Sequence, residues 1–287
     1  MKVFTDITGI REFTSSLRQQ GQTIGFVPTM GFLHEGHMTL MRFAQTKVDC
    51  VVASIFVNPT QFGPTEDFEA YPRDLEGDLA KAAAAGCAAV FVPPVDIMYD
   101  ASSATHISVT GLTDHLCGAS RPGHFDGVCT VVLKLFNIVQ CQVAVFGQKD
   151  YQQLAVIRRM VSDLNVDVDI QSHPIVREHD GLAMSSRNAY LNPAQRQQAL
   201  CLKRGLTNAA AAWHHGERDM IRLRDAIVGE IATVSDALID YVQLSDAHTL
   251  EPIVGTCIDD IVCAVAVHIG STRLIDNCVL SVRNSDS

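Results

Sequence analysis

A short apolar run near the start of the chain ends in a turn with two glycines and two histidines. The segment Ile24 to Val27 is typical of a buried strand, and Gly31 lies in the turn that follows it. His34 and His37 then stand three residues apart, where an amphipathic helix is expected to begin. The N-terminus of a helix favours anions, because its free N–H groups and its dipole both attract negative charge. The sequence therefore predicts a strand–turn–helix unit that can bind phosphate.

Strand-like and helix-like segments alternate through the first 170 or so residues. The run at 50–57 is continuously apolar, as expected of a parallel strand covered on both faces. The remaining strands are expected at 24–28, 88–92, 142–146 and 166–171. Helices are expected from about residue 37, at 74–86, at 127–140 and at 149–164. Asp126 is a candidate N-cap of the helix at 127–140. Repeated βα units predict an α/β fold with a Rossmann-like, doubly wound parallel sheet. Ligands of such sheets bind beyond the carboxyl ends of the strands.

The pattern changes near His173 and Pro174. A polar loop at 177–193 leads to helices expected at 194–213 and 217–234, followed by strands at 239–244, 261–267 and 272–280. This arrangement predicts a smaller α+β domain. We therefore expect two domains, a Rossmann-like domain at 1–174 and a C-terminal lid domain at 175–287.

Composition narrows the classes of partner. The formal net charge of −10 and the absence of a Lys/Arg-rich run disfavour binding to nucleic acid. Nine cysteines form no C-x-x-C pair and mostly lie in apolar runs, which is typical of reduced thiols in a cytoplasmic protein. No apolar run approaches 18 residues and the N-terminus lacks a signal-peptide core, so no association with a membrane is expected.

Three further clusters combine polar side chains with turn residues. Asn58 to Gln61 follows the second apolar strand, where Asn-Pro alone would indicate only a turn. Gly147 to Gln153 includes Lys149 at another strand-to-helix junction, where a lysine can meet a phosphate as a point charge. Met184 to Arg187 offers two hydroxyls and a guanidinium, although Ser-Ser-Arg is short enough to occur by chance. Arg121 and His124 lie in a glycine-containing loop, and either a structural or a functional role is open for them.

Together these clusters closely resemble the pantoate–β-alanine ligase (pantothenate synthetase) family of the HIGH-type nucleotidylyl transferase superfamily. The resemblance spans nearly the whole chain, and its specificity comes from separate blocks in the right order. The matching blocks are Pro28–Gly31, His34–His37, Ser54–Phe62, Tyr71–Arg73, Arg121–Phe125 with Gly127 and Val128, Phe146–Gln153, Asp180–Asn188 with Tyr190 and Leu191, and Arg273–Asn277.

The resemblance implies an ATP-dependent condensation of pantoate with β-alanine through a pantoyl adenylate, with release of pyrophosphate and AMP. It implies catalytic roles for His34, His37, Lys149, Ser185, Ser186 and Arg187. The implied ATP contacts are Met30, Gly31, His34, His37, Gly147, Gln148, Lys149, Asp150, Val176, Met184, Ser185, Ser186 and Arg187. Gln61 and Gln153 would hold pantoate, Gln61 would also help to seat β-alanine, and Asn58 is a further substrate-binding candidate.

The resemblance also implies Mg²⁺ and a homodimer. Asp78 is a weak candidate ligand for the metal, because the phosphates can hold most of the ion. Since pantoate supplies its own carboxylate as nucleophile, the enzyme has only to position the reactants and neutralise charge. We expect Lys149 and Arg187, together with Mg²⁺, to carry most of that neutralisation. We expect loop 177–190 to close over the adenylate.

Four other functions are weighed against this one. The nearest is a nucleotidylyl transferase that adenylates a phosphorylated acceptor and keeps the nucleotide on its product. An aminoacyl-tRNA synthetase is disfavoured by the acidic balance of the chain. A non-catalytic nucleotide-sensing protein is disfavoured by the presence of Lys149, Arg187, Gln61 and Gln153. A zinc hydrolase is the poorest candidate, because H-E-x-x-H sites need histidines four residues apart and no third ligand lies at suitable spacing.

Overall fold

The computed structural model describes residues 1–64 and 66–282, and these form two compact units. The first unit comprises Met1–Thr110, Arg121–Gln148 and Gln153–Val176. The second comprises Gly111–Ser120, Lys149–Gln152 and the described residues from Arg177 onward. The main break therefore lies between Val176 and Arg177. The division of function between domains 1–174 and 175–287 stays a prediction.

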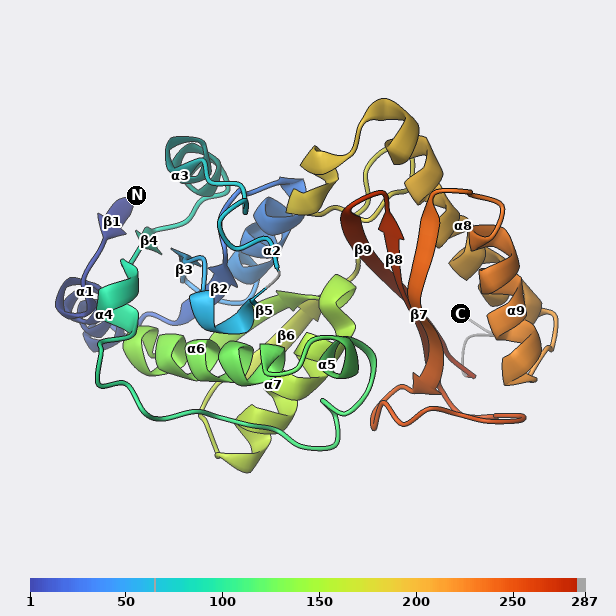
Figure 1. Cartoon of the computed structure of the whole chain (residues 1–287). Helices are drawn as coiled ribbons and strands as arrows, with labels where there is room; N and C mark the ends of the chain where they lie inside the picture. Colours follow the sequence, from blue (N-terminus) through green and yellow to red (C-terminus); the bar gives the residue numbers. More distant parts are fainter. Residues whose placement is uncertain (65, 283–287) are drawn as a thin grey trace. The chain divides into compact units, whose positions relative to one another are not determined.

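A six-stranded parallel sheet forms the centre of the first unit (Figure 1). Its strands, in spatial order, are β1 (Lys2–Phe4), β4 (Ala89–Phe91), β3 (Cys50–Ile55), β2 (Ile24–Thr29), β5 (Val143–Gly147) and β6 (Asp169–His173). The chain runs from β2 outward through β3 and β4 on one side, and through β5 and β6 on the other. The order therefore reverses beside β2, which confirms the predicted doubly wound sheet and marks its switch point.

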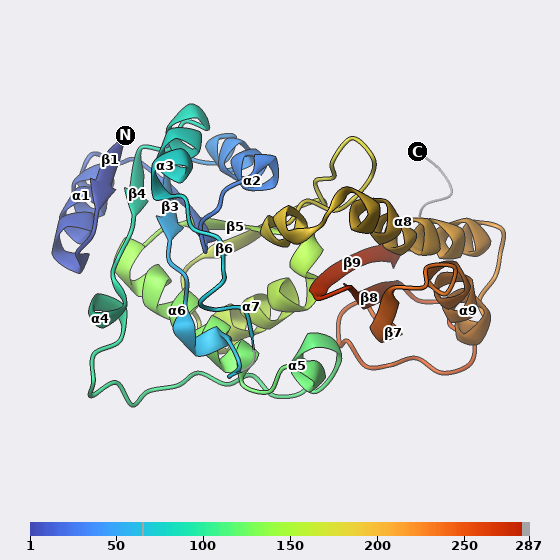
Figure 2. The same cartoon turned by 45° about the horizontal axis from the view of Figure 1, so that its top comes forward.

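Helices cover both faces of this sheet (Figure 2). Val27, Ala53 and Val90 join one core cluster with side chains of α2 (Glu35–Gln45) and α3 (Leu75–Ala84). On the opposite face, Phe26 packs edge-on against Phe136 of α6 (His124–Val139) at 6.4 Å between ring centroids. The sequence of β3 is continuously apolar because its side chains are buried on both faces of the sheet. The helices of this part of the chain are α1 (Ile7–Gln19), α2 (Glu35–Gln45), α3 (Leu75–Ala84), α4 (Val95–Met98), α6 (His124–Val139) and α7 (Tyr151–Asp163).

Some predicted helices and strands begin or end at the wrong residue, and several elements had no prediction, among them β1, α1, α4 and the short helix Leu116–Ser120. Helix α6 begins at His124 rather than 127, and its N-cap is Gly123 with φ of 80°, so Asp126 lies in the first turn and is not the cap. Strand β3 ends at Ile55 rather than residue 57. No strand was predicted at β1 and no helix at α1. Helix α1 has a clear apolar side with Ile10 and Leu17 buried, so the pattern for a helix was present in the sequence and was missed.

The second unit is built on an antiparallel three-stranded sheet of β7 (Ala237–Asp246), β8 (Ile261–Ile269) and β9 (Thr272–Leu280). Two helices, α8 (Pro193–His214) and α9 (Met220–Ile231), lie side by side (Figures 1 and 2) and share a core cluster with the strands. Trp213 of α8 is buried in this cluster, and its indole N–H donates to the carbonyl of Ser281. The predicted α+β architecture is thus confirmed. The short helix α5 (Leu116–Ser120) belongs to this unit.

The nine cysteines are all free thiols, and six of them are buried. Burial raises the pKa of the Cys87, Cys129 and Cys141 thiols to about 12, so these groups stay protonated at neutral pH. Among the described residues, the helices are all too short or too polar to cross a membrane.

Candidate active site

Three loops lie at the carboxyl ends of neighbouring strands around the switch point. Strand β2 pairs in parallel with β3 on one side and with β5 on the other, so the loops after these strands leave the sheet at the same edge. The loop after β2 carries Met30 to His37, and the turn after β3 carries Asn58 to Gln61. Gly147 ends β5 and Gln148 follows it. The structure therefore brings these predicted residues together in the first unit.

The loop after β2 is held by a carboxylate from a different element. Asp78 of α3 is only 1% exposed, and its two oxygens accept the backbone N–H groups of Phe32 and Leu33 at 2.7 and 2.6 Å. Gly31 adopts φ of +85°, and a Cβ at this position would lie 3.0 Å from the Asp78 Oδ2 atom. Only glycine fits this close approach without strain. Asp78 and Gly31 therefore determine the path of the loop that leads to His34.

Asp78 is a poor fit to the predicted role of magnesium ligand. Both oxygens of Asp78 are engaged by N–H donors. Burial raises the pKa of the carboxyl group above its ordinary value, and the two hydrogen bonds only partly oppose this rise. In the part of the chain that the structure describes, no three His, Cys, Asp or Glu side chains are grouped as metal ligands. A magnesium site would therefore rely on ligands other than a protein cage, such as phosphate oxygens and water. The metal role of Asp78 stays a prediction.

The two histidines lie at the first turn of α2. His34 is the N-cap residue of the helix and His37 is its third residue. The His34 backbone N–H donates to Nδ1 of His37 at 3.3 Å, and the two rings stack with centroids 4.0 Å apart. Because Nδ1 of His37 accepts, the hydrogen of the neutral ring resides on Nε2. His37 therefore presents an N–H donor at a helix N-terminus, where an anion is already favoured.

The turn after β3 holds Gln61 from several sides. Asn58 is 1% exposed, and its amide nitrogen donates to Gln61 Oε1 and to the carbonyl of Gly127, both at 3.1 Å. Gln61 Nε2 in turn donates to the sulfur of Met30 at 3.1 Å, which links the turn to the loop after β2. The side-chain amide of Asn58 thus donates to neighbouring residues rather than to a ligand. Its geometry is that of a residue that positions Gln61.

A glycine in α6 permits this arrangement. The turn forms a short 3₁₀ helix, η1 (Pro59–Gln61), that packs directly on α6. A Cβ on Gly127 would lie 2.4 Å from the carbonyl oxygen of Thr60 and 2.7 Å from the backbone nitrogen of Gln61. Both contacts are with backbone, so no side-chain rotation could relieve them. Gly127 is therefore required for the position of Gln61.

The other predicted residues of the first unit are half-buried. Gln148 lies in the 3₁₀ helix η2 (Gln148–Asp150), and its amide donates weakly to the Ser172 hydroxyl at 3.4 Å. Gln153 lies in the first turn of α7, and Val176 is the last residue of the first unit. Their roles as pantoate and ATP contacts stay predictions.

Lys149 and Asp150 group with the second unit, although they follow Gln148 directly in the chain. The Lys149 carbonyl accepts the side-chain amide of Asn277 on β9 at 2.8 Å. Tyr151 and Gln152 are bound to the same unit. The Tyr151 hydroxyl donates to the Ala247 carbonyl, and the Gln152 side-chain amide donates to the Leu112 and His115 carbonyls. The Lys149 ammonium lies 3.7 Å from its neighbour Asp150. The backbone that bears Lys149 is thus anchored independently of its side chain.

Met184 to Arg187 belong to a loop with extensive internal bonding in the second unit. Ser185 is the N-cap of η3 (Ser186–Tyr190) and accepts the Arg187 backbone N–H. At the base of the loop, Arg177 forms a bidentate ion pair with the buried carboxylate of Asp276 at 2.7 and 2.9 Å. Arg196 of α8 pairs with Glu178 and Asp180 at 2.6 and 2.8 Å. These contacts tie the loop to β9 and α8.

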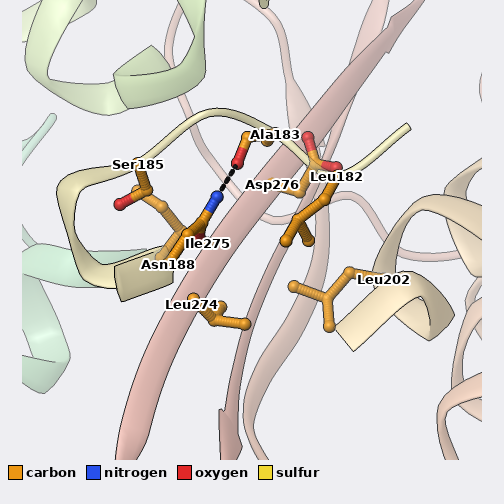
Figure 3. A pocket seen from close by; sticks show the side chains of 8 residues that line it. All are labelled: Leu182, Ala183, Ser185, Asn188, Leu202, Leu274, Ile275 and Asp276. Carbon is orange, nitrogen blue, oxygen red and sulfur yellow. Dashed lines mark hydrogen bonds between the residues drawn. The ribbon is translucent and has the colours of Figure 1, made fainter. Parts of the chain in front are cut away.

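A small cavity lies beneath this loop (Figure 3). The side-chain amide of Asn188 donates to the Ala183 carbonyl beside it. The volume of the cavity is about 10 Å³, which is roughly the space of one water molecule. A nucleotide could not enter it, so this cavity is not the predicted ATP site. Its lining consists of Leu182, Ala183, Ser185, Asn188, Leu202, Leu274, Ile275 and Asp276.

The predicted site residues are thus distributed over both units. The first unit holds Met30, Gly31, His34, His37, Asn58, Gln61, Asp78, Gly147, Gln148, Gln153 and Val176. The second holds Lys149, Asp150, Met184, Ser185, Ser186 and Arg187. Asp276 and Asn277 had no predicted role, although they lie in a block shared with the family. Their contacts span about a hundred residues or more of sequence, which no local pattern reveals.

Comparison with known proteins identifies the family. The model of the pantoate–β-alanine ligase family matches residues 2–279. A pantothenate synthetase of Geobacter sulfurreducens is 55% identical over 280 residues, which cover 98% of this chain and 99% of that protein. The crystal structure of pantothenate synthetase from Thermus thermophilus superposes with a TM-score of 0.93 at 42% identity, covering 98% of this chain and all of that one.

A third relative was crystallised with ligands. The pantoate–β-alanine ligase of Francisella tularensis, described as complexed with β-γ ATP and β-alanine, superposes with a TM-score of 0.78 at 33% identity. The match covers 97% of each chain.

Proposed function

Because the chain belongs to the pantoate–β-alanine ligase family, we propose that it condenses pantoate with β-alanine to pantothenate at the expense of ATP. The observation that carries the mechanism is the hydrogen bond from the His34 backbone N–H to Nδ1 of His37, which makes Nε2 the N–H donor of this ring at the N-terminus of α2, beside the switch point of the sheet. A donor held in place before the reaction stabilises developing negative charge without a cost of reorganisation.

The reaction has two steps. A carboxylate oxygen of pantoate attacks the α-phosphorus of ATP, which forms the acyl–phosphate bond of pantoyl adenylate and releases pyrophosphate. The amine of β-alanine then attacks the acyl carbon, loses a proton as the amide forms, and displaces AMP. No residue of the enzyme has to become a covalent nucleophile. The residues therefore act by holding the reactants close together and by balancing charge.

Each predicted residue has a role in this scheme. His34 and His37 face the phosphates, and Lys149, Ser185, Ser186 and Arg187 neutralise the charge that grows on the leaving pyrophosphate. Gln61 and Gln153 hold pantoate, and Gln61 also helps to seat β-alanine. Met30, Gly31, Gly147, Gln148, Asp150, Val176 and Met184 complete the nucleotide contacts. Support comes from the Francisella relative, whose structure is described as complexed with β-γ ATP and β-alanine.

Mg²⁺ would neutralise part of the phosphate charge when it is bound. The ion prefers oxygen ligands and commonly combines one or two carboxylates with phosphates and waters. The buried Asp78 has both oxygens occupied, so we propose that ATP itself supplies most of the ligands. Activity should then follow the concentration of the MgATP complex. An absolute requirement for a protein-bound ion, detectable by equilibrium dialysis of the protein with Mg²⁺ alone, would contradict this.

Loop 177–190 is proposed to exclude water from the adenylate. Its ties to Asp276 and Arg196 indicate that it would move as part of the second unit rather than as a separate flap. Hydrogen exchange in this loop that is unchanged by ATP and pantoate would contradict the closure.

We further propose a homodimer, by analogy with the family, and a cytoplasmic location, consistent with nine free thiols. Light scattering of the purified protein would test whether it is a homodimer.

The decisive experiment is product analysis. The protein is incubated with MgATP and pantoate, with and without β-alanine, and nucleotides and acids are separated by chromatography. AMP and pantothenate should accumulate only when all three substrates are present, and pantoate alone should support exchange of labelled pyrophosphate into ATP. Absence of AMP under every combination would overturn the proposed function.

A further inference from the structure

We propose that Arg121, Glu66 and His124 form a positioning network that sets the main chain of Gln61, and with it the affinity for the two carboxylate substrates. The inference rests on the proposed function, which assigns Gln61 to pantoate and β-alanine. None of the three residues has a role in the reaction as described above. The three residues and Gln61 all belong to the first unit.

The carbonyl oxygen of Gln61 is the point on which the network converges. It lies 2.8 Å from Nδ1 of His124 and 3.3 Å from Nη2 of Arg121. Nη1 of the same arginine lies 3.1 Å from Nε2 of His124. Two donors from one short segment of chain therefore bind a single carbonyl group about 60 residues away.

These contacts determine the tautomer of His124. A carbonyl oxygen can only accept, so Nδ1 must carry the hydrogen that points at Gln61. A guanidinium group can only donate, so Nε2 must present its lone pair to Arg121. His124 is therefore a neutral ring with its hydrogen on Nδ1. A protonated ring would turn a second N–H toward the arginine and break the network.

Glu66 fixes the plane of the guanidinium group. Its two oxygens accept Nε and Nη2 of Arg121, both at 2.6 Å, and both side chains are largely covered. Burial alone raises the pKa of Glu66, but the hydrogen bonds and charge of Arg121 outweigh this and lower it. A bidentate pair specifies orientation as well as distance. Once Nε and Nη2 are engaged, Nη1 is left pointing at His124.

The side chain of Gln61 is held less firmly than its backbone. The residue is 8% exposed, with Oε1 bound to Asn58 and Nε2 bound to the sulfur of Met30. A thioether is a weak acceptor, so an incoming carboxylate can readily replace it as partner of the Nε2 donor. The network thus supplies a rigid backbone from which one amide donor is available to a substrate.

Two variants of His124 separate this role from a general effect on folding. The side-chain amide of asparagine can place an N–H near the position of the Nδ1 donor, whereas leucine removes it. We expect His124→Leu to raise KM for pantoate and for β-alanine about tenfold, since one partly buried hydrogen bond to the Gln61 carbonyl is lost. KM for ATP should change less than about twofold, and His124→Asn should recover most of the loss. Equal changes in all three KM values, or no difference between the two variants, would overturn the proposal.

A third measurement does not depend on activity. The ¹⁵N shifts of the His124 ring in the labelled wild-type protein, assigned by comparison with His124→Asn, should report a hydrogen on Nδ1 and a lone pair on Nε2. The opposite tautomer or a protonated ring at about pH 7.5 would overturn the network even if the variants fail to fold. If the wild type forms no pantothenate but the tautomer is as stated, the proposed function fails while the network stands.

Discussion

The side-chain amide of Asn277 donates to the backbone carbonyl of Lys149 across 2.8 Å. The two residues are 128 positions apart, and Asn277 is almost completely buried on β9. The contact places the lysine with the second unit, although its chain neighbour Gln148 belongs to the first. A residue near the C-terminus therefore sets the position of the side chain to which we assign the phosphates.

Replacing Asn277 by leucine should impair the first step of the reaction. Leucine is close in shape but leaves the Lys149 carbonyl without its donor, a loss commonly worth about 1–3 kcal/mol when the group is buried. We expect pyrophosphate exchange to slow roughly tenfold. Asn208→Leu, on the exposed side of α8, is the matched control and should exchange at the wild-type rate. A wild-type rate in Asn277→Leu would remove its role.

Lys149→Ala should lower the rate of adenylation at least about a hundredfold. Loss of one preorganised charge at the leaving group is often worth about 3 kcal/mol. The fold should persist, because the segment is held through its carbonyl and through Tyr151 and Gln152 rather than through the ammonium group. Single-turnover adenylation and circular dichroism separate the two effects. Lys47→Ala, an exposed lysine on the other unit, serves as control.

Asp78→Asn tests whether this residue holds a loop or a metal. The amide keeps one acceptor and loses the other, so one of the Phe32 and Leu33 N–H groups is left unpaired at a cost of about 1–3 kcal/mol. We expect a lower Tm and a higher KM for ATP. If the aspartate instead binds magnesium, a roughly tenfold excess of the ion should restore activity. Restoration by magnesium would contradict the loop-holding role.

Gly127→Ala should displace the turn that carries Gln61. The added methyl group would meet the Thr60 carbonyl at 2.4 Å, so either η1 or α6 must shift. We predict a loss of stability and a weaker affinity for pantoate by calorimetry. Gly229→Ala, in α9 with no atom within 4 Å of the new Cβ, should instead stabilise the protein by about 0.5–1 kcal/mol. Equal effects of the two substitutions would refute the argument.

The ion pair of Glu66 with Arg121 should make stability depend on pH. The pKa of Glu66 in the folded protein lies below its ordinary value. Its contribution is therefore fully present above about pH 4.3, the unfolded pKa, and is lost as the pH falls through the folded pKa. Glu66→Gln should lower the free energy of unfolding by roughly 0.5–1 kcal/mol at neutral pH. The difference in stability between this variant and the wild type should disappear at acid pH. The same substitution in an Arg121→Met background should show no such pH dependence in urea unfolding.

Much of the fold follows from local patterns. The apolar runs of β2, β3 and β5 predict buried strands because parallel strands covered on both faces have no polar side. Their alternation with helices predicts the doubly wound sheet, and hence the edge at which His34 and Gln61 lie. Helix starts were less accurately predicted, since Gly123 rather than a side-chain cap begins α6. These errors shift an element by a few residues without changing its place in the sheet.

The sequence by itself determined the family, the order of the strands along the chain and the identity of the histidine, lysine and serine–arginine blocks. Only the tertiary structure decided what holds them in place. Asp78 acts on a loop 45 residues before it, and Asn277 on a lysine 128 residues before it. The reason is physical, because a buried polar atom needs a partner whose identity depends on the path of the backbone. Local pattern specifies that path only within a strand or a helix.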